Sequence, residues 1–233
     1  MGQVTEVDPT AVSAYRDPPG EAPWALPIVV RAEKGAEPTA IAVAEATATA
    51  VVRLLADPRS SDGEWTPPVQ RWLDGRIRKV ARRARGARWV TVSALPGVTV
   101  EHDGAQVRAL LPTPTDAVPP EVAKLQVAGL ELAPGKAAPP KPGELPIALT
   151  PHVVMSPLKA AVQAAHAAQL AYSTMSDDEL PSWRDTGFQV RVNYPDAATW
   201  ARRASSARVV VRDAGFTEIP PGTRTALTLW GGR

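Results

Sequence analysis

A proline-rich segment divides the chain into two halves. Residues 133–146, APGKAAPPKPGELP, contain five prolines and two glycines. Proline lacks a backbone N–H and stiffens the chain toward polyproline II, so a semi-rigid spacer is expected here. The 233 residues are therefore expected to form two small units, residues 24–132 and 147–233, joined by this linker.

The half after the linker alternates between strand and helix patterns. Ile147–Val154 is an apolar run that suits a buried strand, and Ser156 followed by Pro157 is a typical helix start, with the helix reaching about Tyr172. A short helix around Trp183 follows, and then the segments QVRVNY, DAATWARRA, ARVVVRD and GTRTALTLW suit strand, helix, strand and strand. This order predicts an α/β unit with a mixed sheet of about four strands flanked by helices.

The sequence patterns of the first half occur in the same order as those of the second half. LPIVVRAEKG precedes an alanine-rich helical pattern as LPIALTPHVVMS does, ARRARGARWVTV from Ala81 parallels ARRASSARVVVR from Ala201, and Thr99–Gly104 keeps the spacing of Thr217–Gly222. We interpret this pattern as an internal duplication. We expect two similar α/β units that form an intramolecular pseudo-dimer, so that the chain is a monomer.

The match between the halves has a gap. Eight residues separate Trp72 from Ala81, against seventeen between Trp183 and Ala201, so the first unit is expected to lack a strand equivalent to QVRVNY. A chain rich in alanine and arginine also aligns with itself by chance, and this alternative stays open.

Composition narrows the class of protein. The chain has no cysteine, which excludes disulfides, thiolate catalysis and zinc-thiolate sites. No stretch reaches the ~18 uncharged apolar residues that a membrane span requires, and the first residues lack the basic region of a signal peptide. We expect a cytoplasmic protein without a membrane partner, and a disordered tail over residues 1–23.

Positive charge is concentrated in the first half. Residues 71–88 carry eight of the 26 basic residues with one acid, although the net charge of the chain is only +2. If this segment is a helix, one side of it carries an apolar stripe of Val69, Leu73, Ile77, Val80 and Ala84. A basic stripe beside it consists of Arg71, Arg78, Arg82 and Arg85. A basic helix is expected, either as a solvated face or as a surface that binds RNA phosphates through Arg78, Arg82 and Arg85.

One face of the helix after Ser156 is the first candidate site. Lys159, Gln163 and His166 are spaced by four and three residues in an otherwise alanine-rich segment, so they share a face. A cation, an amide and an imidazole suit a phosphate or a polar ester, although such residues also occur simply facing solvent.

The segment VRDAGFTEIPPGTRT, residues 211–225, is the second candidate. A strand ends at Asp213, the chain turns at Gly215, and Thr217 and Glu218 precede a second turn. Polar groups at strand ends in α/β proteins are favoured places for ligands, because rigid backbone positions them at the rim of the sheet. Ordinary turn chemistry accounts for the glycines and prolines but not for Asp213.

The two candidate segments form a pair of separated motifs in a fixed order. The pattern K-M-x-x-G-K-x-A-A-Q-x-x-H-A is matched in register by Met155, Lys159, Ala161, Gln163, His166 and Ala167. The pattern D-A-G-R-T-Q-I-x-P-G-x-x-T is matched by Asp213, Ala214, Gly215, Thr217, Ile219, Pro221, Gly222 and Thr225. Over roughly residues 145–230 the chain thus resembles the type-II peptidyl-tRNA hydrolase family, and the diverged first half resembles an actinobacterial branch.

The resemblance implies an enzyme that hydrolyses the ester between a peptide and the 3′ end of tRNA, with no metal or organic cofactor. It implies that Asp213 orients or deprotonates water and that Lys159 contacts the tRNA backbone or the ester. It also implies supporting roles, as hydroxyl donors or positioning groups, for Thr217, Thr225, Gln163 and His166. The implied partners are tRNA, peptidyl-tRNA and the ribosome.

Departures from the motifs keep two other functions open. Val154 replaces a lysine of the first motif, and Phe216 and Glu218 replace an arginine and a glutamine of the second. A catalytically impaired RNA- or ribosome-associated module is one alternative, and a protein-interaction module whose arginines bind an acidic partner is the other. The first half is not expected to carry the chemistry, because the residues aligned with Lys159, Gln163, His166 and Asp213 are Ala40, Ala44, Thr47 and Ser93.

Overall fold

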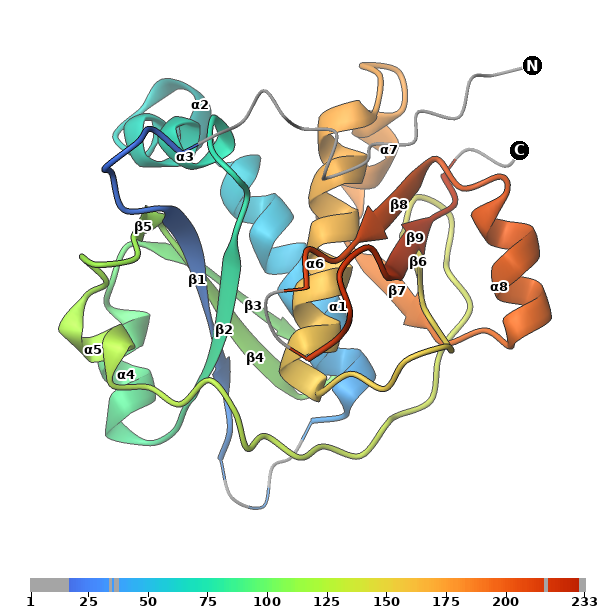
Figure 1. Ribbon diagram of the computed structural model, residues 1–233, viewed down its shortest axis with the longest axis horizontal. Helices are drawn as coiled ribbons and strands as arrows, with labels where there is room; N and C mark the ends of the chain where they lie inside the picture. Colours follow the sequence, from blue (N-terminus) through green and yellow to red (C-terminus); the bar gives the residue numbers. More distant parts are fainter. Residues whose placement is uncertain (1–16, 34, 36–37, 216–217, 231–233) are drawn as a thin grey trace.

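The computed structural model describes residues 17–33, 35, 38–215 and 218–230. These residues form two mixed sheets with two long helices between them (Figure 1). The first sheet contains β1 (Trp24–Arg31), β2 (Lys79–Ala84), β3 (Gly97–His102), β4 (Ala105–Leu110) and β5 (Thr113–Pro114). The second contains β6 (Leu145–Leu149), β7 (Val190–Asn193), β8 (Val209–Arg212) and β9 (Arg224–Thr228).

The two sheets have the same strand order and the same pairing. The order is β2-β1-β4-β3 in the first and β7-β6-β9-β8 in the second, with the first pair parallel and the other two antiparallel. The sequence Leu-Pro-Ile lies in the central strand of each sheet, where Leu26 pairs with Lys79 and Leu145 pairs with Val190. The prediction of two similar units, each a mixed sheet flanked by helices, is confirmed for the strand order and the strand pairing.

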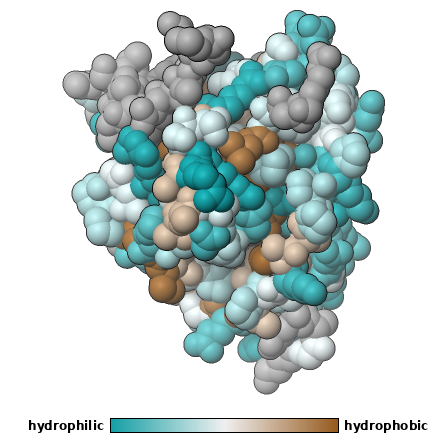
Figure 2. All heavy atoms as spheres, turned by 90° about the vertical axis from the view of Figure 1, so that its right-hand side faces the viewer, coloured by the Kyte–Doolittle hydropathy of each residue, from teal (hydrophilic) through white to brown (hydrophobic). Residues whose placement is uncertain are grey.

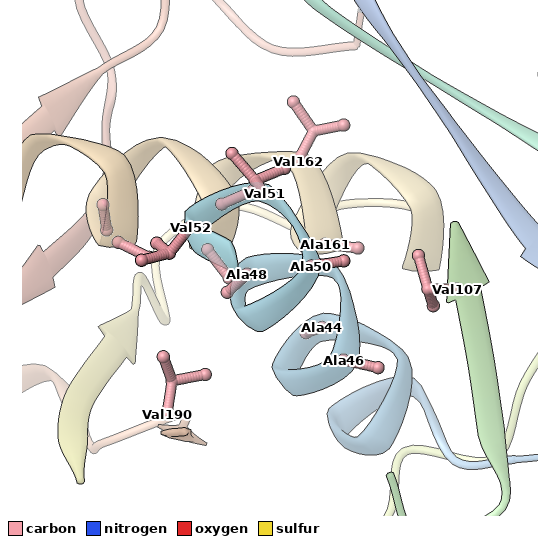
Figure 3. Close-up of a cluster of buried hydrophobic side chains, with 14 of the residues drawn as sticks. Ala44, Ala46, Ala48, Ala50, Val51, Val52, Val107, Ala161, Val162 and Val190 are labelled. Carbon is pink, nitrogen blue, oxygen red and sulfur yellow. The ribbon is translucent and has the colours of Figure 1, made fainter. Parts of the chain in front are cut away.

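Helices α1 (Ala40–Leu55) and α6 (Pro157–Thr174) pack against each other between the sheets (Figure 1). α1 also contacts β7 of the second sheet, and α6 contacts β2 of the first. Figure 3 shows the crossing, with Ala50 and Val51 on α1 and Ala161 and Val162 on α6. Alanine favours the helix and, being small, lets the two axes approach closely.

Six shorter helices complete the described part of the chain. They are α2 (Pro58–Asp62), α3 (Thr66–Leu73), α4 (Ala87–Ser93), α5 (Pro120–Ala123), α7 (Leu180–Asp185) and α8 (Ala197–Ala204). α4 and α5 cover the outer face of the first sheet, and α8 covers that of the second (Figure 1). The face over the second unit is mostly hydrophilic, with apolar residues in small separate patches (Figure 2). No helix among the described residues has the length and apolar character that crossing a membrane would need.

The main hydrophobic core is shared by both units. It joins the inner faces of both sheets to α1 and α6, and includes Ile28, Val107, Ile147 and Val192. Each fully buried aliphatic side chain of this kind contributes about 1.5–3 kcal/mol. The two units are therefore held together by burial of apolar surface and not by the linker alone.

The start of the linker is attached to the first unit. The carbonyl oxygens of Ala133 and Pro134 accept hydrogen bonds from the N–H groups of Ala40 (2.8 Å) and Ile41 (3.2 Å) at the N-terminus of α1. Residues 135–142 have no regular structure and are exposed, as a spacer requires. β6 begins at Leu145, inside the predicted linker, and ends at Leu149, earlier than the predicted strand.

The predicted basic helix is wrong. α3 ends at Leu73, and the following residues turn and form β2, which pairs in parallel with β1. The indole N–H of Trp72 donates to the carbonyl oxygen of Arg78 (2.8 Å) and fixes this turn. β2 is the strand that the first unit was expected to lack, because pairing with a strand distant in sequence outweighs the helical preference of alanine and arginine.

The alignment of the two halves is wrong beyond Trp72 for the same reason. Ala81 lies in β2, whereas Ala201 lies in α8. Thr99 lies in β3, whose counterpart by strand pairing is β8, and β8 ends before Thr217. The sequence match of these segments therefore does not correspond to equivalent positions in the fold.

Part of the predicted tail is attached to the first unit. Residues 1–16 lie outside the described residues. Asp17 accepts a hydrogen bond from Arg78 (2.8 Å), and Glu21 accepts one from Arg71 (2.7 Å). The prediction of a disordered tail is therefore wrong for residues 17–23.

Candidate active site

The candidate site lies where the loop between β8 and β9, residues 213–223, meets the first turns of α6 (Figure 1). α6 begins as predicted, because the hydroxyl of Ser156 accepts a hydrogen bond from the N–H of Lys159 (3.3 Å) and Pro157 occupies the first turn. Gly215 has φ +79°, and a Cβ there would lie 2.7 Å from the backbone nitrogen of Pro221. The loop therefore requires glycine at this position.

Asp213 is the centre of the site. Its Oδ2 accepts hydrogen bonds from Nζ of Lys159 (2.6 Å) and Nε2 of Gln163 (2.7 Å), and its Oδ1 accepts one from the N–H of Gly215 (2.8 Å). Lys159 and Gln163 are one turn apart on α6, so the helix presents both to the same carboxylate. Charge-assisted hydrogen bonds of this kind hold the loop against the helix.

The Asp213 carboxylate retains capacity for one more donor. A carboxylate has about four acceptor positions, two on each oxygen. The described residues use both positions on Oδ2 and one on Oδ1. The side chain is 8% exposed, and the fourth position has no donor among the described residues, which exclude residues 216 and 217 of the same loop. The arrangement can orient a water molecule beside the ammonium group of Lys159.

Thr225 is placed by a β-bulge. The pairing of β8 with β9 shifts between Val211–Ala226 and Arg212–Arg224, which leaves Thr225 as the extra residue. Its hydroxyl donates to Oε1 of Gln163 (2.5 Å), and the residue is fully buried. Thr225 therefore sets the orientation of the Gln163 amide and does not face a ligand.

Glu218 attaches the far side of the loop to α6. Its Oε2 accepts a hydrogen bond from the N–H of Ser156 (2.9 Å), and its Oε1 accepts one from the Ser156 hydroxyl (2.6 Å). A carboxylate is favoured at a helix N-terminus, where the N–H groups lack partners and the helix dipole is positive. From the sequence, Glu218 is a polar residue of the candidate loop and a departure from the motif, but nothing in the spacing of residues predicts its contact with Ser156.

His166 lies apart from Asp213, at the contact between the two units. Its Nδ1 is 2.9 Å from Nζ of Lys79 in β2, and Lys79 also donates to Gln169. Burial lowers the pKa of Lys79 well below its ordinary value. Burial, followed by the charges of Lys79 and Lys159, lowers the pKa of His166. Among the described residues His166 thus bonds to Lys79 and not to Asp213, and its role in the site stays a prediction.

The three arginines expected to bind RNA do not form one stripe. Arg78 is bonded to Asp17, and Arg82 donates to two carbonyl oxygens at the C-terminal end of α5, those of Ala123 (3.3 Å) and Leu125 (2.9 Å). Arg85 is exposed beyond the end of β2, at a cavity of about 280 Å³. The shared basic face required a helix, and a strand places neighbouring residues on alternate faces. Thr217, the remaining predicted residue, lies outside the described residues.

The first unit has no counterpart of the site loop. β3 and β4 are joined by Asp103 and Gly104 alone, with φ 43° and 79°, as in a type I′ turn. By strand pairing, the position of Asp213 corresponds to the end of β3 and not to Ser93, which lies in α4.

The positions of α1 that correspond to the site residues of α6 also lack an amine, an amide and an imidazole. The capping residues Thr39 and Ser156 begin α1 and α6 in the same way. Counted from these caps, the counterparts of Lys159, Gln163 and His166 are Ala42, Ala46 and Thr49, two residues later than the sequence alignment placed them. The first unit lacks the groups of the site under either correspondence.

One group of the described residues has ligand atoms close enough for a metal ion. These are Glu45, His102 and Asp103, whose ligand atoms lie within 4.8 Å of one another. Nη1 of Arg191 lies 3.5 Å from both Oε2 of Glu45 and Nε2 of His102. The guanidinium already supplies positive charge where a metal would sit, so we interpret the group as an ion-pair network between α1 and β7.

Comparison with known proteins bears on the second unit. A model of the family Peptidyl-tRNA hydrolase PTH2 matches residues 147–231. The matched segment contains α6 and the loop with Asp213, and it excludes the first unit. No solved structure matches the chain significantly. The resemblance to type-II peptidyl-tRNA hydrolases is thus confirmed for this part of the chain, whereas the duplication and the actinobacterial branch stay predictions.

Proposed function

We propose that the second unit hydrolyses the ester between a peptide and the 3′ end of tRNA, and therefore acts in the cytoplasm. The observation that carries the proposal is the Asp213 carboxylate, which Lys159 and Gln163 hold within the segment that matches the family. A buried carboxylate with one open acceptor position beside a cation has the two groups that ester hydrolysis by water requires.

In the proposed reaction, Oδ1 of Asp213 orients a water molecule and takes its proton as the water oxygen bonds to the ester carbonyl carbon. Lys159 stabilises the negative charge that develops. The bond from this carbon to the ribose oxygen then breaks, and the ribose oxygen takes up the proton that Asp213 removed from the water, which restores the carboxylate. Gln163 and Thr225 are positioning residues, because they hold Asp213 in place and touch no reacting atom.

We also propose that the two units are a duplicated pair that forms an intramolecular pseudo-dimer with one site. The shared strand order, the Leu-Pro-Ile sequence in both central strands and the reciprocal contacts of α1 with β7 and α6 with β2 support this proposal. In this arrangement the first unit is a scaffold that α6 packs against, and residues 133–146 join the pair.

A second candidate function is an RNA- or ribosome-associated module that keeps the fold without turnover. Two observations favour it. Three of the acceptor positions of Asp213 are already occupied by donors of the protein, and Glu218 adds negative charge beside a site for a polyanionic substrate.

Release of peptide from peptidyl-tRNA tests the first function. Asp213→Asn keeps the shape of the side chain and removes its charge, and is expected to lower the rate about 10²–10⁴-fold. Asp103→Asn is the matched control, because it changes an aspartate at the end of the corresponding strand in the first unit, and is expected to leave the rate unchanged. Turnover equal to buffer, with tRNA binding retained, would replace the first function by the second.

A further inference from the structure

Two arginines lie opposite each other at the root of the site loop, by which we mean the place where β8 ends and β9 begins. Arg212, the last residue of β8, pairs with Arg224, the first residue of β9, directly beyond the bulge at Thr225. Arg212 is also the residue before Asp213. Arg224 is exposed and Arg212 is partly exposed. Both chain ends of the site loop therefore carry a guanidinium group.

Strand geometry places these two arginines on one side of the hairpin. Val211 belongs to the inner core that α6 covers, and Val210 belongs to the outer cluster under α8. Because side chains alternate along a strand, Arg212 shares the outer side with Val210. Arg224 is its cross-strand partner and lies on the same side.

Like charges directly opposite each other destabilise a sheet. Both arginines have contacts within the chain, so their placement and charge, and not a lack of partners, suggest a role. Arginine binds phosphate oxygens in a fork geometry, and two guanidinium groups side by side repel each other less when an anion lies between them.

Charge on the rest of the loop is arranged differently. The charge of Lys159 is offset by Asp213 at 2.6 Å, and Glu218 places an acid at the N-terminus of α6. A phosphate is therefore repelled on the Glu218 side of the loop and attracted to its root. Arg212 is next to Asp213 in the chain, but its side chain lies on the outer side of the hairpin, whereas Asp213 contacts α6 on the inner side. An RNA whose 3′ ester lies at Asp213 therefore meets the arginines where its backbone passes over the rim of the sheet.

We propose that Arg212 and Arg224 bind a backbone phosphate of the RNA whose 3′ ester lies at Asp213, which rests on the proposed function. The pair selects an ester carried on RNA over an ester of the same peptide without a phosphate. It also gives the RNA one direction on the protein, with its backbone over the root of the loop and away from Glu218.

Binding of fluorescently labelled, deacylated tRNA over a series of salt concentrations tests the phosphate contact. The variant Arg212→Ala/Arg224→Ala is expected to bind at least about tenfold more weakly, and the slope of log K against log salt is expected to fall by about one for each arginine. The control Arg88→Ala/Arg202→Ala removes the same charge from exposed positions on α4 and α8, and is expected to change neither quantity. Arg212→Lys/Arg224→Lys should restore the salt slope, which excludes misfolding as the cause.

Hydrolysis separates this inference from the proposed function. The alanine double variant should lose activity on peptidyl-tRNA but keep it on a peptidyl-adenosine ester, which lacks the phosphate. Equal tRNA binding by the alanine double variant and the wild-type protein overturns the inference, even if hydrolysis is found. Arginine-dependent tRNA binding without any hydrolysis supports the phosphate site and rejects the hydrolase. A wild-type protein that binds no tRNA at low salt overturns both.

Discussion

The hairpins β3–β4 and β8–β9 occupy the same place in sheets of the same strand order, yet they differ in what joins their strands. The first is closed by two residues, Asp103 and Gly104, and the second by residues 213–223. The long loop brings Asp213 and Glu218 onto α6, whereas the short turn places Asp103 beside His102, near Glu45 of α1, and supplies no counterpart of the Asp213 contacts among the described residues. The sheet and helix thus determine the fold, and one connection determines whether a site exists.

The two sheets also differ in the residues that face the helices between them. At the parallel strand pair, Lys79 of the first sheet corresponds to Val190 of the second. Lys79 meets His166 and Gln169 of α6, whose counterparts on α1, counted from the helix caps, are Thr49 and Val52. At this position the contact of α6 with β2 is polar and buried, whereas the counterparts in α1 and β7 are Thr49, Val52 and Val190. The contact of α1 with β7 has its buried polar group elsewhere, at Glu45, which accepts hydrogen bonds from Arg191 and from the N–H of Val192.

Exchanging the connections should have the largest effect. Replacing residues 213–223 by Asp-Gly is expected to reduce hydrolysis to background, because Asp213 and Glu218 are removed together. The fold should persist, since the first unit shows that these two residues close such a hairpin. Peptide release and thermal unfolding check both expectations. Hydrolysis that survived the exchange would place the reaction elsewhere in the chain.

Removing the buried amine should stabilise the protein. Lys79→Met is expected to raise the free energy of unfolding at neutral pH, because a buried amine with no carboxylate partner among the described residues is replaced by an apolar side chain of similar length. The loss of its hydrogen bonds to His166 and Gln169 offsets part of this gain, which should be at most about 1–3 kcal/mol. The matched change Val190→Met in the second sheet should bring no gain. Urea unfolding at several pH values measures both.

The same variants test the pH dependence of stability. The pKa of Lys79 is lowered in the folded protein, so the unfolded chain takes up its proton first and wild-type stability falls as the pH decreases below the ordinary lysine value of 10.5. The lowered pKa of His166 adds a further loss below its ordinary value of 6.5. Lys79→Met should remove the alkaline part of this dependence, and an unchanged slope between pH 7 and 10 would contradict the assignment.

Glycine substitutions compare the two connections directly. Gly104→Ala should cost about 1–2 kcal/mol of stability, because φ is positive but the space around a Cβ is open. Gly215→Ala carries the same strain and also meets Pro221, so it should cost more and should lower hydrolysis about tenfold or more by moving Asp213. Equal effects of both changes on hydrolysis would contradict the role of the loop.

Removing the helix caps should give the smallest effects. Thr39→Ala and Ser156→Ala each remove an N-cap and should each cost about 1 kcal/mol. Ser156→Ala also removes the hydroxyl that donates to Glu218, so its cost should be the greater of the two and only this variant should alter hydrolysis. Chemical unfolding and peptide release, measured on both variants, check this order.

The second unit could be predicted closely because its signals are local. Ser156 and Pro157 mark the start of α6, and short apolar segments bounded by turns mark β7, β8 and β9. The strand β2 could not be predicted in the same way. KVARRA is short and rich in alanine and arginine, and it becomes a strand only because β1 lies beside it.

The site was predictable where sequence spacing determines geometry, and only there. Lys159 and Gln163 are one turn apart and meet Asp213 as the motifs imply. His166 shares their face but lies about 10 Å further along the helix axis than Lys159, where this face meets Lys79 of β2. The contacts of Glu218 with Ser156 and of Arg212 with Arg224 depend on the path of the loop and on a bulge, which residue spacing does not reveal.

The attachment of the linker to α1 bears on how the buried Lys79 persists. Residues 133–146 keep both units on one chain, so each is exposed to the other at an effective concentration on the order of millimolar, whatever the protein concentration. If the units were separate subunits, the desolvation of Lys79 would reduce their binding free energy, and dilution would separate them. Two units on one chain stay together at any protein concentration, so they can tolerate the buried Lys79, which would weaken a dimer of separate subunits.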